Sequence, residues 1–324
     1  MEQGKGKVRL YGCGGLGANV ALRYLNRQSA PGFADLLPSF VDTSRSNLTD
    51  AVQEEDVFIL EKTDGSGKVR KENHAQISAV IKQILLKQAP EDFNIVVFSA
   101  SGGSGSVIGP LLAKELADRG HSVVIVSAGS SEAAITARNT LNTVKSLSAI
   151  TKQIDKPLVA FYRHNGGEAT RKIVDDQLDF AISCLCYLAS RQNAELDTKD
   201  IYNWLNINKS TSVEAQLVLL DIFAGAADVS EITDPISIAS LYADRNQPHL
   251  ETPVPEYSCT GYFLHPVKDI TELHFVVSTQ HLGATFDRLQ STINDFEQRS
   301  EGRAAAQKLI NDAKDTVTDD GLVL

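Results

Sequence analysis

Short apolar runs alternate with amphipathic segments through the first half of the chain. The runs have the length and β-branched content of buried strands, and the segments between them carry apolar residues at helical spacing. Strands are predicted at 8–11, 38–42, 57–60, 95–98, 122–126 and 158–162, and helices at 15–26, 73–87, 107–119 and 132–151. This alternation is typical of an α/β fold with a doubly wound parallel sheet and helices on both faces.

The pattern changes in the second half. Residues 168–191 are apolar on nearly every face beyond the first turns, which predicts a long central helix buried on all sides, about 30–35 Å in length. A smaller α+β region should follow it. Its predicted elements, with the terminal helix, are a helix at 213–224, strands at 257–264 and 272–278, and a helix at 282–314. The apolar stripe of this last helix fades after Gln298, so its second half should project from the body.

One side-chain-poor segment joins the strand at 95–98 to the helix at 107–119. Ser99 to Ser106, which we call the focal loop, contains only Ser, Gly and Ala. Glycines let backbone N–H groups approach an anion, serines add hydroxyl donors, and a helix N-terminus adds partial positive charge. The focal loop is therefore interpreted as a phosphate cradle; the alternative is a plain Gly/Ser turn.

A second glycine-rich loop follows the first strand. Gly12, Gly14 and Gly17 fit the dinucleotide pattern G-x-G-x-x-G, and Asp42 ends the second strand, where a ribose-binding carboxylate would lie. An NAD-dependent oxidoreductase is therefore a competing interpretation. Such an enzyme does not need a second phosphate cradle, and no Gly-Lys-Ser/Thr follows either loop.

Two carboxylates stand three residues apart after the central helix. Asp197 and Asp200 flank a helix start, where such residues most often serve as caps. A functional role is the alternative, and the residues by themselves leave both open.

Composition and charge narrow the classes of function. The 324 residues carry a formal net charge of −10, which disfavours direct nucleic-acid binding because the phosphate backbone would be repelled. No apolar run approaches the roughly 20 residues of a membrane helix, and the N-terminus has no apolar signal region, so a cytoplasmic protein is expected. The four cysteines form no C-x-x-C pair and the seven histidines show no ligand spacing, so free buried thiols and no zinc are expected.

In combination these stretches resemble the tubulin/FtsZ superfamily. The loop from Gly12 to Asn19 resembles the family's opening loop, and Ser101 to Ser106 resembles the signature G-G-G-T-G-[ST]-G. Asp175 begins the segment where the family reads guanine, and Leu196 to Ile201 resembles the V-D-F-A-D-V loop. The departures from the family pattern are Leu16, Ala18, Ser101, Ser104 and Val107, and Arg171 in place of a base-stacking aromatic.

The resemblance implies a GTPase that binds GTP or GDP with Mg²⁺ on the phosphates and no confident side-chain ligand for the metal. Asn165 and Asp175 would bracket the base. Asp197 and Asp200 would be catalytic in the site of the next subunit, so hydrolysis would require head-to-tail self-assembly. The implied nucleotide-binding residues are Gly12, Cys13, Gly14, Gly15, Asn19, Asp42, Thr43, Gly65, Ser66, Ser101, Gly102, Gly103, Ser104, Gly105, Ser106, Glu132, Asn165, Arg171 and Asp175.

The end of the chain indicates which branch of the superfamily the protein resembles most. A long terminal helix and a short acidic, Leu-tipped tail at 315–324 are most similar to the phage-encoded PhuZ tubulins, in which the tail docks on a neighbouring subunit and filaments position phage DNA in the host cytoplasm. Plasmid-partitioning and cell-division tubulins are the alternatives. The expected parts are a GTP-binding domain at 1–167, a central helix at 168–194, an activation domain at 195–281, and a terminal helix with tail at 282–324.

Overall fold

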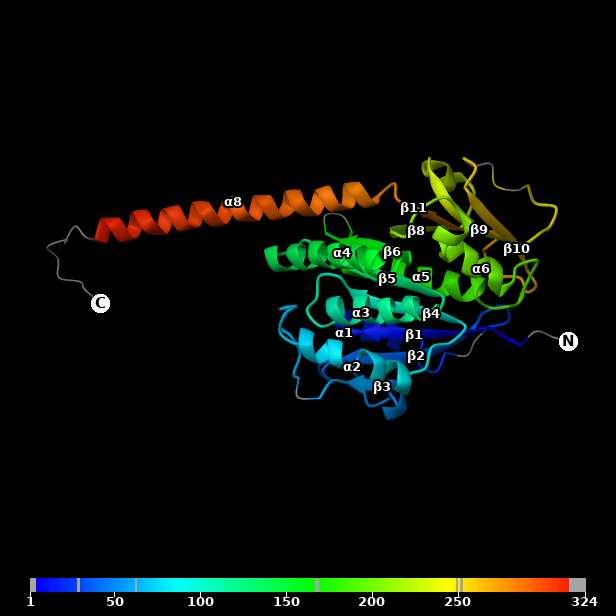
Figure 1. Ribbon diagram of the computed structural model, residues 1–324, viewed down its shortest axis with the longest axis horizontal. Helices are drawn as coiled ribbons and strands as arrows, with labels where there is room; N and C mark the ends of the chain where they lie inside the picture. Colours follow the sequence, from blue (N-terminus) through cyan, green and yellow to red (C-terminus); the bar gives the residue numbers. More distant parts are fainter. Residues whose placement is uncertain are drawn as a thin grey trace.

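A computed structural model describes residues 4–27, 30–61, 63–166, 169–248, 250 and 253–314 of the chain. Its described strands form one sheet in the order β3-β2-β1-β4-β5-β6-β8-β11-β9-β10-β7 (Figure 1). The strands from β3 to β8 in this order are all parallel, whereas β11 is antiparallel to both of its neighbours. The doubly wound α/β fold expected from the sequence is confirmed.

The elements follow in chain order. The strands are β1 (Lys7–Cys13), β2 (Asp35–Asp42), β3 (Val57–Ile59), β4 (Phe93–Ser99), β5 (Val123–Ser130), β6 (Leu158–Asn165), β7 (Asn193–Ala194), β8 (Leu217–Phe223), β9 (Pro235–Tyr242), β10 (Tyr257–Phe263) and β11 (Glu272–Ser278). The helices are α1 (Gly14–Leu22), α2 (His74–Lys87), α3 (Gly105–Asp118), α4 (Ala134–Ile154), α5 (Arg171–Leu188), α6 (Thr198–Leu205), α7 (Ile207–Ser210) and α8 (Leu282–Lys314), with 3-10 turns η1 (Glu54–Asp56) and η2 (Ala227–Glu231).

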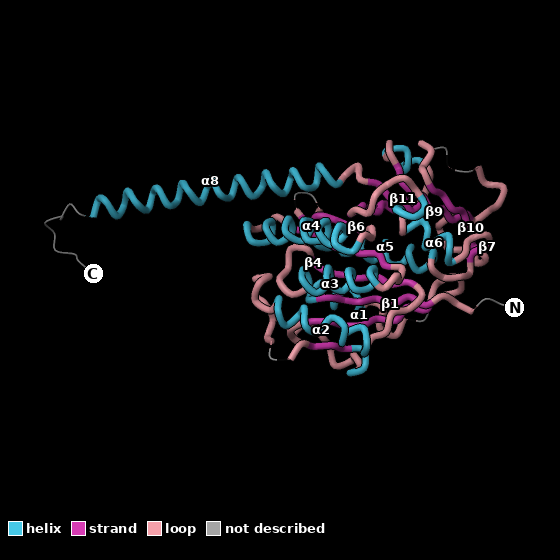
Figure 2. The backbone as a smooth tube through the Cα atoms, viewed as in Figure 1, coloured by secondary structure: helices cyan, strands magenta, loops and turns pink. Residues whose placement is uncertain are grey.

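Alternate residues of each parallel strand enter different cores, because successive side chains of a strand point to opposite faces. In β4, Ile95 and Val97 pack in one core together with residues of α1 and α5. Val96 and Phe98 pack in the other, together with residues of α2, α3 and α4. The strands therefore form one layer through the body, covered by helices on both faces (Figure 2).

Helix α5 is the predicted central helix, shorter than expected at 18 residues, or about 27 Å. Its Thr170 N-cap accepts a hydrogen bond from the Ile173 N–H. Most of its second half is buried; Ser183 and Tyr187 are half-buried and Phe180 is 38% exposed. The predicted helix at 15–26 is also shorter, since α1 ends at Leu22 and the chain then turns through Asn26, which has a positive φ.

The predicted helix at 213–224 is wrong. Residues Leu217–Phe223 form strand β8, which lies in the sheet between β6 and β11. A short, continuous apolar run fits a buried strand as well as a buried helix, and here pairing on both sides decides for the strand. Strand β9, which the sequence pattern did not predict, begins at Pro235 and pairs with β11 and β10.

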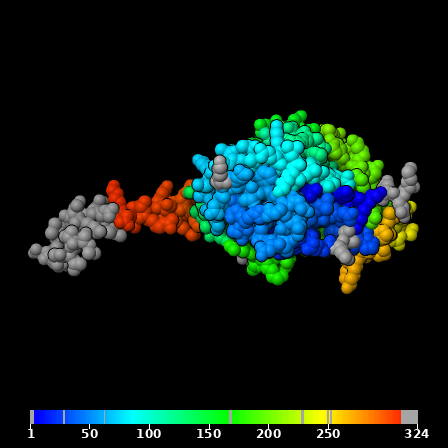
Figure 3. All heavy atoms as spheres, turned by 90° about the horizontal axis from the view of Figure 1, so that it is seen from below, coloured from blue at the N-terminus to red at the C-terminus, as the bar shows by residue number. Residues whose placement is uncertain are grey.

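Helix α8 has the predicted bounds, and its first half packs on the body while its second half projects, as predicted. Leu289 and Ile293 of its first half are buried against Ala137 and Leu141 of α4. Beyond this contact the described side chains face solvent, Leu309 being 71% exposed. The second half of the helix projects from the body (Figures 1 and 3). The tail at 315–324 lies outside the described residues.

None of the helices in the described part of the chain combines the length and the apolar content that a membrane span requires. The sheet continues from β6 to β8 without interruption, and the four-part division of the chain stays a prediction.

A histidine is buried in the C-terminal half of the sheet. His274 of β11 has its Nδ1 3.0 Å from Ser240 Oγ and its Nε2 3.5 Å from Oε2 of Glu272. Glu272 is itself held by the Ala226 N–H at 2.7 Å. Burial lowers the pKa of His274, more strongly than the Glu272 carboxylate raises it.

Unfolding should therefore become easier as the pH falls below about 6.5, the ordinary pKa of a histidine. The unfolded chain binds a proton there that the buried imidazole does not take up, so stability present at neutral pH is lost towards the lower folded-state pKa of His274. Urea midpoints at pH 7.5 and 5.5 should differ less in a His274→Gln variant than in the wild type. An equal loss in both proteins would contradict this origin, since His164, whose pKa burial also lowers, titrates in both.

Candidate functional site

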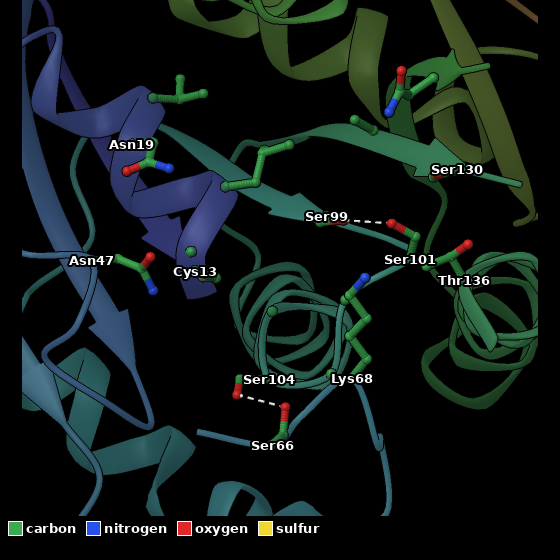
Figure 4. A pocket seen from close by; sticks show the side chains of 18 of the residues that line it. Cys13, Asn19, Asn47, Ser66, Lys68, Ser99, Ser101, Ser104, Ser130 and Thr136 are labelled. Carbon is green, nitrogen blue, oxygen red and sulfur yellow. Dashed lines mark hydrogen bonds between the residues drawn. The ribbon is translucent and has the colours of Figure 1, made fainter. Parts of the chain in front are cut away.

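A cavity of about 550 Å³ opens at the carboxyl ends of the parallel strands, where ligands of open α/β sheets bind. It is bordered by the N-terminal ends of α1, α3 and α5. The residues that the sequence singled out and that line it are Cys13, Gly15, Asn19, Asp42, Gly65, Ser66, Ser101, Gly102, Gly103, Ser104, Gly105, Glu132, Asn165, Arg171 and Asp175. Figure 4 shows the serines of the focal loop and Asn19 of α1 around this space.

The two glycine-rich loops touch each other at the floor of the cavity. A Cβ on Gly105 would lie 2.6 Å from the Cys13 carbonyl oxygen, and one on Gly14 would lie 2.8 Å from the Gly105 nitrogen. Gly14 also has a φ of +68°, which favours glycine. Because α1 begins at Gly14 and α3 at Gly105, two helix N-termini meet here and their partial positive charges add.

Four of the residues expected to bind nucleotide lie behind the lining. Gly12 and Gly14 allow the close approach of α1 and of the focal loop. Ser106 Oγ donates hydrogen bonds to the Gly102 and Gly103 carbonyls at 2.7 and 3.0 Å, so it shapes the focal loop from within. The fourth is Thr43, which is buried.

Three hydroxyl groups from three loops converge beside the focal loop. Ser104 Oγ lies 2.5 Å from Thr43 Oγ1 and donates to Ser66 Oγ at 3.1 Å (Figure 4). The carbonyl of Gly65 accepts from Asn73 Nδ2 at 2.6 Å. The loop before α2 is thereby drawn against the focal loop.

Asp42 is nearly buried at the end of β2. Its carboxylate accepts from the Thr43 N–H at 2.7 Å and from Asn47 Nδ2 at 3.3 Å. Burial raises the pKa of Asp42, and these hydrogen bonds offset part of that effect.

The opposite end of the cavity carries a charged cluster from β6, α5 and the segment before α4. Glu132 lies 2.6 Å from Arg171 Nη2 and accepts from Asn165 Nδ2 at 3.1 Å. The hydrogen bond from Arg171 lowers the pKa of Glu132. Asp175 lies 3.5 Å from Arg23. Arg171 is thus engaged by a carboxylate, at the position where the resemblance leads one to expect a base-stacking aromatic.

Asp197 and Asp200 do not line this cavity. They begin α6, beyond the far end of α5, and cap that helix. Asp197 Oδ1 accepts from the Lys199 and Asp200 N–H groups at 2.7 and 2.9 Å, and Asp200 Oδ2 accepts from the Asp197 N–H at 3.0 Å. The structural role expected from the sequence is therefore present, and it leaves Asp197 exposed.

Sequence reasoning missed part of the lining. Lys68 follows the Gly65-Ser-Gly67 segment, so a cation beside a glycine-rich loop was the available signal. The other lining residues that the sequence did not single out are Val20, Ser44, Ser46, Asn47, Ala128, Gly129, Ser130, Thr136 and Val174, whereas Leu16 and Ser99 belong to the two predicted loops. The four cysteines are free and buried, as expected, and burial raises the pKa of the Cys13 thiol in the cavity wall.

The known proteins that are similar to this chain in sequence and in structure include several of one kind. Residues 196–280 match the family described as phage tubulin-like protein, C-terminal domain. The phage tubulin-like protein of Pseudomonas phage PhiPA3 is 33% identical to this chain over 322 residues, which cover 99% of each. The structure is similar to a protofilament of TubZ from bacteriophage PhiKZ, with a TM-score of 0.81, 28% identity, and 98% of this chain and 95% of that chain covered. It is also similar to the phage tubulin PhuZ with GDP, with a TM-score of 0.82, 26% identity, and 98% of each chain covered.

Proposed function

The chain belongs to the family of phage tubulin-like proteins, and we propose that it is a GTPase that assembles head to tail into filaments. The family accounts for both glycine-rich loops at once, which the dinucleotide interpretation of Gly12, Gly14 and Gly17 does not. A phage tubulin of similar structure binds GDP, and other similar structures are protofilaments.

The cavity suits a guanine nucleotide lying across it. Two helix N-termini and the backbone of the focal loop would hold the phosphates, since such groups bind anions without a cationic side chain. Asn165 and Asp175, at the other end, would bracket the base, an aspartate being suited to accept from the guanine N1 and N2 donors.

Magnesium fits the donor set at the phosphate end. Mg²⁺ prefers oxygen ligands and is commonly bound through substrate phosphates, one or two carboxylates and water. Asp42 and the hydroxyls of Ser66 and Ser104, all in the cavity lining, offer such oxygens. When bound, the ion would neutralise charge on the phosphates.

The catalytic carboxylates would come from a second copy, and one observation carries this proposal. Asp197 and Asp200 follow the far end of α5, a helix about 27 Å long whose first residue, Arg171, borders the cavity. Figure 1 shows α6 on the right of the body and the loop between β3 and α2 on its left. Different surfaces would meet at each junction, and such a heterologous contact that does not close gives a filament. There the carboxylates would orient the attacking water.

Turnover that depends on assembly tests this function. Phosphate release per subunit should be near zero at low protein concentration and should rise above a critical concentration, together with light scattering. Turnover per subunit that is independent of protein concentration would contradict a shared site. Stabilisation by NAD rather than GTP in a thermal-shift comparison would instead favour the oxidoreductase.

Membership of this family also suggests where the filaments act and what they position. We propose that the filaments act in the cytoplasm of an infected bacterium and position phage DNA without touching it, in keeping with the net charge of −10. A plasmid-partitioning or cell-division role is the alternative. Fluorescent filaments that do not follow phage DNA during infection would favour these alternatives.

We further propose that the acidic tail at 315–324 docks on a neighbouring subunit. Deleting it should raise the critical concentration for assembly and leave nucleotide affinity unchanged, because the tail would add contact between subunits only. Light scattering and nucleotide titration measure the two effects separately. An unchanged critical concentration would show that the tail adds nothing to assembly.

A further inference from the structure

One lysine in the cavity wall, Lys68, forms no ion pair in the described part of the chain, although its charge adds to that of Arg171 in lowering the pKa of Glu132. Of the basic lining residues, Arg171 is paired with Glu132, and the lining carboxylate Asp175 lies beside Arg23. Among the residues that the structure describes, no acidic group lies within ion-pair distance of Lys68. Figure 4 shows its side chain reaching from the loop before α2 towards Ser101 of the focal loop.

The backbone of Lys68 is fixed to the focal loop by a buried amide. Asn139 of α4 is 6% exposed, and its Nδ2 donates to the Lys68 carbonyl at 2.8 Å. The same nitrogen lies 3.1 and 3.2 Å from the carbonyls of Ser101 and Gly102. One side chain thus holds the loop that carries Lys68 at a set position beside the phosphate cradle.

A second cation, Arg70, lies behind the focal loop and outside the cavity lining. Arg70 Nη2 donates to the Ser106 carbonyl at 3.1 Å, and in the described part of the chain its buried Nε has no hydrogen-bond partner. Burial alone lowers the pKa of Arg70. The charges of Lys68 and Arg70 and the partial positive charge at the N-terminus of α3 together make the neighbourhood of the focal loop favourable to an anion. The arrangement therefore fits an anion of more than one charge.

We propose that Lys68 distinguishes nucleoside triphosphate from diphosphate by pairing with the terminal phosphate, and that Asn139 is the positioning residue that holds it there. The inference rests on the proposed function, because it takes the base to lie at the Asn165 and Asp175 end. The terminal phosphate then lies at the end closed by Ser66 and Lys68.

Nucleotide affinities of four proteins test the proposal. GDP and a slowly hydrolysed GTP analogue are titrated into the wild type, Lys68→Ala, Lys68→Arg and Lys71→Ala, below the assembly concentration. Lys68→Ala should bind the GTP analogue on the order of 10-fold or more weakly, since a charge-assisted contact is lost, and should bind GDP within about twofold of the wild type. Lys68→Arg should recover most of the loss. Lys71→Ala removes the same charge from an exposed position outside the cavity and should change neither affinity.

The role of Asn139 has its own test. Asn139→Ala should weaken the GTP analogue more than GDP, and the double variant with Lys68→Ala should lose less affinity than the sum of the two single losses, because both changes remove the Lys68 contact. A merely structural role would weaken both nucleotides alike and would add to the effect of Lys68→Ala.

The outcomes separate the two proposals. A wild type that binds both nucleotides, with Lys68→Ala losing both equally or losing neither, overturns the discrimination by Lys68 and leaves the GTP-binding function standing. A wild type that binds neither nucleotide overturns the proposed function, and this inference with it.

Discussion

Replacing Asp200 by asparagine should lower GTP turnover by a factor on the order of 100 or more while filaments still form. The substitution removes the negative charge that would orient the attacking water in the neighbouring cavity. It keeps a side-chain oxygen that can accept the Asp197 N–H, so the start of α6 should remain folded. Phosphate release and light scattering measured on the same sample separate loss of chemistry from loss of assembly.

Two controls sharpen this result. Asp176→Asn removes an exposed carboxylate that pairs with Lys172 at 2.6 Å on α5, and it should change neither quantity. Asp200→Asn subunits mixed with subunits whose cavity is blocked should recover part of the turnover, because a junction that joins the cavity of the first to the carboxylate of the second has both halves intact. Mixtures that stay inactive, or full activity of Asp200→Asn alone, would contradict a site shared between copies.

The first half of the fold can be predicted from the sequence because the residue patterns that determine its strands and helices lie within each element. Parallel strands that are buried on both faces read as short apolar runs, and the helices that cover them keep an apolar stripe. The stripe through Leu289 and Ile293 likewise predicted α8 with its bounds.

The second half could not be read in the same way. β8 is a strand because β6 and β11 lie on either side of it, which is information that a seven-residue apolar run does not contain. β9 contains the strand-favouring residues Ile236, Ile238 and Tyr242. It also begins with Pro235 and includes Ser237 and Ser240, which interrupt the apolar run. Its place in the sheet depends on β11, which comes later in the chain.

The candidate site likewise contains residues that a local sequence pattern predicts and residues that only the folded chain brings into the cavity. Glycines are required wherever backbone approaches backbone, so the Gly12 and focal loops could be identified from sequence spacing. Lys68 and Asn47 enter the cavity because of how their loops are held, and the amide that holds Lys68 comes from α4, 71 residues later in the chain. No local pattern reports such a contact. The sequence suggested both a capping and a catalytic role for Asp197, and one subunit by itself displays the capping role.

Replacing Gly105 by alanine should weaken nucleotide binding on the order of 10-fold or more and lower the stability of the fold by about 1–3 kcal/mol. The new Cβ would lie 2.6 Å from the Cys13 carbonyl oxygen, which is backbone and cannot turn aside. The two loops that would hold the phosphates must then separate, so the helix N-termini no longer converge on one anion. Nucleotide titration and urea unfolding measure the two effects.

The sign of the stability change makes this test decisive. Helix propensity alone predicts that glycine to alanine in a helix stabilises by roughly 0.5–1 kcal/mol. A Cβ on Gly283 of α8 would point into open space, with no atom of another described element within 4 Å, so Gly283→Ala should not destabilise the fold and should leave nucleotide affinity unchanged. Gly105 is also helical, and it has an ordinary φ, so any loss there must come from the close approach to Cys13. If Gly105→Ala instead behaves like Gly283→Ala, the contact between the two loops does not shape the site.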